Sequence, residues 1–225
     1  MSSLDLLPAF IDESTDSQVV FRHILKAMSE PGTIIDMTNN KESYSTFSSL
    51  SMQQNKLSCL WSVAQTLLDS DCSVFVCASI SDKSFMQSLS FFTGVSFAHD
   101  IKSADFIFMS MHELKDLNDF NLGGIEKPHL SSTVLVYVES MTAAEQIILS
   151  GPGIKGSRSL ALTGLDAEKI DLLKNNNKLY PCGIDFIFCS ETSMTAIARS
   201  TQIKSGYINS DNIKNKTTIN TTEAQ

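Results

Sequence analysis

The sequence predicts an α/β fold whose sheet is mostly parallel with an antiparallel part. Helical and strand-like segments alternate through the middle of the 225-residue chain, and strand-like segments follow one another closely near its C-terminus. A hydrophobic content of 42% is enough for a sizeable core. We expect one α/β domain over residues 1–205, with an N-terminal arm, and a disordered tail over residues 206–225, where Asn, Lys and Thr replace apolar residues.

The N-terminal part predicts an extended arm over residues 4–14 and a helix over residues 18–28. Asp16 or Ser17 is expected to cap this helix, and the sequence Pro31-Gly32 ends it. Apolar residues recur there at helical spacing, namely Val20, Phe21, Ile24, Leu25 and Met28. A short strand over residues 33–37 and a serine-rich loop over residues 41–54 are expected to follow.

The middle of the chain predicts two further helices and three strands. The helices are expected over residues 55–68 and 82–92, the second capped by Ser81 or Asp82 and closed before Gly94. The strands are expected over residues 72–78, 105–110 and 133–138, with one or two helical turns over residues 112–120.

The stretch from residue 147 to residue 199 carries the most unusual local chemistry. Strands are expected over residues 147–150 and 158–163, joined by a turn with three glycines, and a polar helix, a Pro-Gly loop and a buried strand over residues 184–189 follow. Gly151, Gly153 and Gly156 mark a place that needs positive φ or close backbone approach.

Charge and cysteine content exclude several classes of protein. A net charge of −8 and a pI near 4.9 argue against nucleic-acid binding. The apolar runs are too short to cross a membrane, and the N-terminus lacks the pattern of a signal peptide. Five cysteines without Cys-x-x-Cys spacing indicate reduced thiols, so we expect a cytoplasmic protein.

Anion binding is one interpretation of the glycine turn. Lys155 and Arg158 beside exposed backbone N–H groups would suit an anion, although the turn has no Walker sequence and leads into a strand. A tight turn between two strands is the alternative. His112-Glu113 begins like a zinc helix, but Asp116 stands where the second histidine is required, so no metal site is expected.

Two further residues are candidates with two interpretations each. His23, beside Arg22 and Lys26, could hold a proton or a phosphate, or be a surface histidine. Asp185 begins a buried strand, so its carboxylate is either functionally perturbed or paired with an arginine for structure. No serine or cysteine nucleophile has the spacing of a hydrolase motif.

Four blocks of the sequence resemble the PhnH family, the H subunits of the bacterial carbon–phosphorus lyase system for phosphonate use. They are residues 21–32 (FRHILKAMSEPG), 149–154 (LSGPGI), 180–186 (YPCGIDF) and 198–201 (ARST). The last block has Arg199-Ser200 where the family is expected to have Arg-Thr, which keeps a hydroxyl. The middle of the chain fits only in its pattern of elements.

The resemblance implies a three-layer α/β/α sandwich like the large domain of PLP-dependent transferases, without PLP. It implies a homodimer that joins the G, I and J subunits in a core complex. That complex replaces the adenine of MgATP by an alkylphosphonate and forms ribose 1-phosphonate 5-triphosphate. A nucleosidase-like activity belongs to the I subunit, and this chain is not expected to be active alone.

The resemblance and the residues together suggest an anion cleft near a dimer or partner interface. Substitution at an anomeric carbon needs a nearby carboxylate, and phosphonate and triphosphate need cations. The expected residues of the cleft are Arg22, Lys26, Gly151, Gly153, Lys155, Asp185 and Arg199, with Asp185 orienting an arginine. The alternatives are a non-catalytic dimeric scaffold for the partner subunits and a diverged PLP enzyme.

Overall fold

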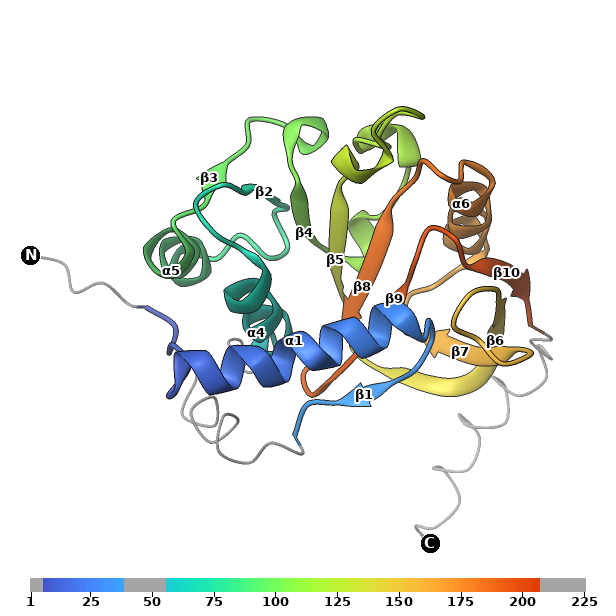
Figure 1. Ribbon diagram of the computed structural model, residues 1–225, viewed down its shortest axis with the longest axis horizontal. Coiled ribbons are helices and arrows are strands. Elements are labelled where there is room, and N and C mark those ends of the chain that lie inside the picture. Colours follow the sequence, from blue (N-terminus) through green and yellow to red (C-terminus); the bar gives the residue numbers. More distant parts are fainter. Residues whose placement is uncertain (1–5, 39–55, 207–225) are drawn as a thin grey trace, which may run out of the picture.

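A seven-stranded mixed sheet forms the centre of the computed structural model, which describes residues 6–38 and 56–206 (Figure 1). Five neighbouring strands run parallel, and β9 and β1 continue the sheet in antiparallel pairings. In sheet order the strands are β1 (Ile35–Asp36), β9 (Ser193–Ile197), β8 (Asp185–Cys189), β5 (Thr133–Tyr137), β4 (Phe106–Ser110), β2 (Ser73–Val76) and β3 (Ser96–Phe97).

Three helices cover the first face of this sheet. They are α1 (Glu13–Ser29), α4 (Ser58–Leu67) and α5 (Lys83–Thr93). Alternate residues of the strands, such as Phe108, Leu135 and Ile187, point into the core that these helices close. Trp61 of α4 lies within this core, and its indole N–H donates to the carbonyl of Pro8 at 2.9 Å.

The second face is covered by a helix and by a second sheet. The helix is α6 (Ala167–Lys178), and the antiparallel strands are β10 (Gln202–Ser205), β6 (Met141–Ser150) and β7 (Arg158–Leu162), in that order. The other alternate residues of the main strands, including Val134, Val136, Phe186 and Phe188, form the core on this side. The covering layer here is therefore partly sheet rather than helices alone.

The prediction of a mostly parallel, mixed α/β sheet is confirmed, and most expected elements are present. Residues 112–120 form two short helical turns, η3 (Met111–Glu113) and η4 (Leu117–Asp119), as expected. Further short helical turns within the described residues are η2 (Ile101–Ser103) and η5 (Pro128–Leu130). The expected loop over residues 41–54 and the expected tail lie outside the described residues, apart from Gly206.

The two largest errors in the expected boundaries have a local cause. Helix α1 begins at Glu13, because Asp12 caps it and accepts a hydrogen bond from Thr15 N at 3.1 Å. Asp16 lies inside the helix, where its carboxylate accepts from the N–H of Ile11 and of Asp12. Strand β6 begins at Met141 rather than at residue 147, because its first half is mostly exposed and gives no alternation.

Candidate functional site

The glycine turn is locked to the C-terminal end of α1. Gly153 has φ +78°, and a Cβ at this position would lie 1.8 Å from the carbonyl oxygen of Ser29. Only glycine allows the two backbones to approach so closely. The carbonyl end of α1 that faces the turn is the negative end of the helix dipole, so this contact favours a cation rather than an anion.

Arg158 supplies that cation. Its Nη1 donates to the carbonyl oxygens of Glu30 and Pro31, both at 2.8 Å. Gly32, in the same turn after α1, has φ +77° and lies against the side chains of Leu149 and Arg158. The helix end, the glycine turn and the start of β7 therefore form one interlocked unit.

Asp185 and Arg199 form a second unit at the start of β8. Asp185 Oδ1 accepts from the backbone N–H of Arg199 at 2.8 Å, and its Oδ2 accepts from Arg199 Nε at 3.1 Å and Nη2 at 2.5 Å. Arg199 Nη1 donates to the carbonyl of Pro128 at 2.7 Å. The two side chains are 19% and 16% exposed, so a largely buried ion pair fixes the guanidinium.

The remaining predicted cations lie on the surface. Arg22 and Lys26 are exposed on α1, one turn apart, and Lys155 is exposed in the glycine turn. Gly151 lies 3.3 Å, measured from an added Cβ, from the carbonyl of Ser200, so the turn also meets the segment that carries Arg199. The fold brings the family blocks together around the end of α1. No contact among the described residues joins Arg22 or Lys26 to Asp185.

The two histidine candidates, His23 and His112, lie in different environments. Burial lowers the pKa of His23, and the positive charge of Lys26 lowers it further. His112 Nδ1 lies 2.6 Å from the hydroxyl of Ser110. Within the described part of the chain, no three His, Cys, Asp or Glu side chains are grouped to hold a metal ion.

Glu113 and Cys77 lie close together beside the C-terminal end of β2. Burial would raise the pKa of Glu113, but hydrogen bonds from Ser79 and Ser110 bring it below the ordinary value. Burial and the nearby Glu113 carboxylate raise the pKa of Cys77 to about 11, so its thiol stays protonated at neutral pH. All five cysteines are free.

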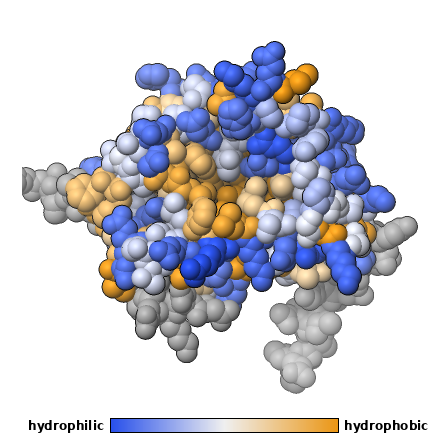
Figure 2. All heavy atoms as spheres, viewed as in Figure 1, coloured by the Kyte–Doolittle hydropathy of each residue, from blue (hydrophilic) through white to orange (hydrophobic). Residues whose placement is uncertain are grey.

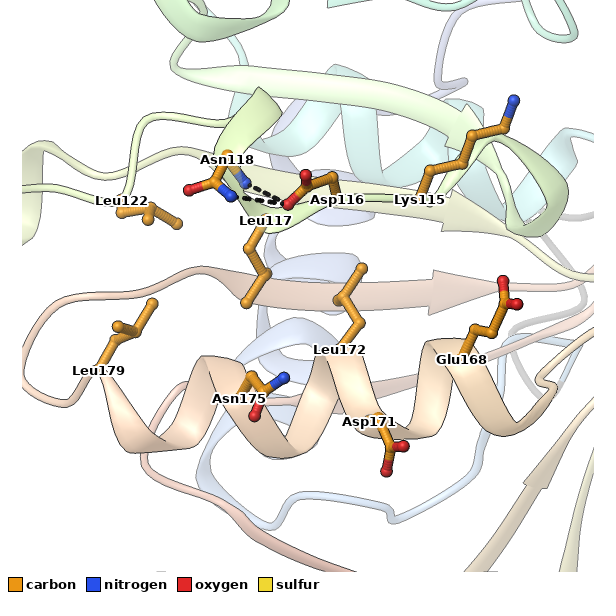
Figure 3. A pocket seen from close by; sticks show the side chains of 10 residues that line it. All are labelled: Lys115, Asp116, Leu117, Asn118, Leu122, Glu168, Asp171, Leu172, Asn175 and Leu179. Atoms are coloured by element: carbon orange, nitrogen blue, oxygen red, sulfur yellow. Dashed lines mark hydrogen bonds between the residues drawn. The ribbon is translucent and has the colours of Figure 1, made fainter.

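The sequence did not predict a hollow of about 370 Å³ between α6 and residues 115–122. In Figure 3, Leu117 and Leu172 extend from opposite sides into this space, while the side chain of Lys115 extends away from α6. Its rim is acidic, with Asp116, Glu168 and Asp171 opposed by Lys115 alone, so it does not suit a phosphonate or a triphosphate. The lining residues are dispersed along two segments of the sequence and form no recognisable motif.

Comparison with known proteins places the chain among the bacterial phosphonate metabolism proteins. The model of the family described as bacterial phosphonate metabolism protein (PhnH) matches residues 8–204, and the chain belongs to this family. The resemblance found in the four sequence blocks is thereby confirmed.

Two relatives carry descriptive names. Over 197 residues the chain is 27% identical to the alpha-D-ribose 1-methylphosphonate 5-triphosphate synthase subunit PhnH of Rhizobium meliloti (strain 1021), covering 87% of this chain and 94% of the relative. Over 186 residues it is 25% identical to a protein of Stutzerimonas stutzeri named as C-P lyase subunit HtxG, covering 83% and 85%. Both relatives are named as subunits, the first of a synthase and the second of a C-P lyase. Among the described residues, no helix combines the length and the apolar character of a membrane span.

Proposed function

We propose that the chain is a cytoplasmic subunit of the carbon–phosphorus lyase core complex, acting with the G, I and J subunits. In this proposal the complex converts MgATP and an alkylphosphonate to ribose 1-phosphonate 5-triphosphate and adenine, and the chain forms a homodimer. The observation that carries the proposal is the relative that spans nearly the same length and is named as a subunit of that synthase.

The fixed guanidinium of Arg199 supports contact with an anionic substrate. An arginine has five N–H donors, and Arg199 uses three of them on Asp185 and Pro128 through Nε, Nη1 and Nη2. The remaining N–H groups are held in a fixed direction and the side chain is partly exposed. A preorganised donor of this kind stabilises negative charge at a small entropic cost.

Arg22, Lys26 and Lys155 complete the proposed set of cations. They are exposed, so an anion could reach them without displacing an internal contact. They do not line a hollow with Arg199 in the described part of the chain. The proposed cleft is therefore completed by another chain rather than by this one alone.

A non-catalytic scaffold is the second candidate, and a specific observation favours it. Arg158 donates to two carbonyls at the end of α1, and Gly153 packs against the same helix end. Gly153 was an expected residue of the anion cleft and anion binding was one interpretation of Arg158, yet the fold gives both residues structural contacts. In this alternative the chain holds its partners in place and contacts no substrate.

Adenine release tests the proposal. The G, I and J subunits are incubated with MgATP and methylphosphonate, with and without this chain, and adenine is quantified. We expect release to require the chain. Release at the full rate without it would contradict the proposal.

Binding and growth then separate the two candidates. Calorimetry compares the binding of ATP and methylphosphonate to the assembled complex with the unaltered chain and with Lys155→Ala: weaker binding in the variant indicates that the chain contacts substrate, and equal binding indicates a scaffold. Strains with Arg22→Ala, Arg199→Ala or Asp185→Asn are grown on methylphosphonate. Normal growth of all three, with the complex assembled, would exclude the cleft.

The proposal includes a fold like that of the PLP-dependent transferases, with no PLP on this chain and MgATP as a substrate of the complex. Added pyridoxal phosphate is accordingly expected to give no Schiff-base absorbance band. Such a band, lost when a single lysine is replaced, would revive the third interpretation.

A further inference from the structure

Helix α1 has two apolar faces, and only one of them is covered. Val20, Ile24 and Ala27 point into the core against α4 and the main sheet. Phe21 and Leu25 lie one turn apart on another side of the helix and are 45% and 52% exposed. Two large apolar side chains at this spacing form an anchor pair of the kind that a partner groove accepts.

The face of the molecule that α1 crosses also carries a hydrophobic area. Figure 2 shows hydrophobic side chains gathered in the middle of the face that α1 crosses, along the helix and above it, with strongly hydrophilic side chains beside them. An apolar centre with a polar rim is the usual anatomy of a protein–protein interface. Single exposed apolar residues need no such explanation, but a gathering of them does.

The hydrophilic border of this face is basic. Arg22 and Lys26 are exposed next to Phe21 and Leu25, and the sequence from residue 17 to residue 29 contains no acidic residue. Neither cation forms an ion pair within residues 6–38 and 56–206. This basic strip stands out on a chain of net charge −8.

The charge pattern argues against a second copy of the chain on this face. A two-fold axis through the middle of α1 would bring Arg22 and Lys26 of one copy close to the same residues of the other, and like charges repel. A different chain with an apolar groove and carboxylates around it would gain both contacts.

We propose that the outer face of α1, formed by Phe21, Arg22, Leu25 and Lys26, is the docking surface for a different subunit of the complex, which presents an apolar groove rimmed by carboxylates. The inference rests on the proposed function, because it requires partner subunits. It uses Arg22 and Lys26, two of the three exposed cations of the proposed anion cleft, to meet the partner's carboxylates, so Lys155 and Arg199 are the cations that this chain keeps for substrate.

The test uses the full chain with its G, I and J partners. A Phe21→Ser/Leu25→Ser variant is compared with a Phe91→Ser/Ile125→Ser control, which removes one aromatic and one aliphatic side chain that are 64% and 83% exposed elsewhere. Affinity is measured by calorimetry, assembly by size-exclusion chromatography with light scattering, and folding by circular dichroism.

We expect the Phe21→Ser/Leu25→Ser variant to bind at least about 30-fold more weakly, because central anchors dominate interface energy, and the control to bind like the unaltered chain. An Arg22→Glu/Lys26→Glu variant is expected to lose about 10-fold in affinity at low salt, with the loss shrinking as NaCl is added.

Three outcomes would overturn the docking surface. If the Phe21→Ser/Leu25→Ser variant is folded and keeps full affinity for the partners, the surface is wrong while the proposed function stands. If the variant instead changes the mass of the isolated chain and leaves partner binding intact, a second copy occupies the face. If the unaltered chain binds none of the partner subunits, both the docking surface and the proposed function fail.

Discussion

The C-terminal end of α1 and the outer face of the same helix belong to one sequence block, residues 21–32, but the fold uses them differently. The end is enclosed by the glycine turn and by Arg158, which donates to Glu30 and Pro31. The outer face keeps Phe21 and Leu25 about half exposed. Residues 21–32 therefore contribute both a helix end that is packed into the fold and an exposed surface.

The difference shows that cations of similar appearance in the sequence have different roles in the fold. Arg158 and Arg199 donate to internal acceptors, whereas Arg22, Lys26 and Lys155 remain exposed. Substitutions of Arg158 and Arg199 should change stability, and in the proposed function a substitution of Arg199 also weakens substrate binding. Substitutions in the second group should change binding and leave stability almost unaltered.

The largest effect is expected from Gly153→Ala. Its Cβ would meet the Ser29 carbonyl at 1.8 Å in a backbone with φ +78°, so we expect the free energy of unfolding to fall by about 4 kcal/mol or more. Gly156→Ala is the matched control, because Gly156 has φ +77° but no atom within 4 Å of the added Cβ, and about 1–2 kcal/mol is expected. Urea unfolding measures both, and equal losses would show that the helix contact adds nothing.

The Asp185–Arg199 pair comes second. Asp185→Asn or Arg199→Ala leaves one largely buried charge without its partner, so we expect about 3 kcal/mol of destabilisation in either variant and little more in the double variant. Asp171→Asn removes a surface pair with Lys174, in which the Asp171 side chain is 70% exposed, and should cost less than about 1 kcal/mol. Additive losses in the double variant would contradict coupling between Asp185 and Arg199.

Arg158→Lys should cause a smaller loss of stability, and it separates the contribution of the guanidinium's shape from that of its charge. The variant keeps the positive charge near the end of α1 but lacks the planar guanidinium that reaches both carbonyls, so about 1–2 kcal/mol of destabilisation is expected. Lys155→Ala, at an exposed position of the same turn, should change the free energy of unfolding by no more than about 0.5 kcal/mol. A loss for Lys155→Ala as large as for Arg158→Lys would remove the distinction between the enclosed and the exposed cation.

His23, on the same helix, gives the smallest effect. Burial and then Lys26 lower its pKa below the ordinary 6.5, so the unfolded chain takes up a proton first as the pH falls. The free energy of unfolding should therefore decrease below pH 6.5, and this contribution should be constant above it. Titration followed by NMR should show a higher pKa for His23 in Lys26→Gln, still below 6.5 because burial is the larger cause. A pKa at or above 6.5 in the unaltered protein would exclude the buried environment.

Local sequence patterns predicted the helices and strands in which apolar residues recur at regular spacing. The apolar spacing of α1 and the β-branched run of β5 give both segments correctly. The patterns missed β3, β9, β10 and the first half of β6. Strands β9 and β10 and the first half of β6 are held by antiparallel pairing with β8, β6 and β7, respectively. In all four segments an alternation of apolar and polar residues is short or absent.

The candidate site was predicted in its residue types but not in its arrangement. The sequence singled out Gly153, Asp185 and Arg199 as residues in special backbone or partly buried positions. It could not show that Gly153 meets the end of α1 or that Asp185 holds Arg199. It also gave no sign of the acidic hollow beside α6.

By itself, the sequence determined the α/β class, the order of most helices and strands, and the family. Only the tertiary structure decided that Arg158 reaches a carbonyl 128 residues away and that Phe21 and Leu25 stay uncovered. The physical reason is that periodicity reports which side of an element is apolar, whereas the contacts between distant segments depend on how every layer packs at once.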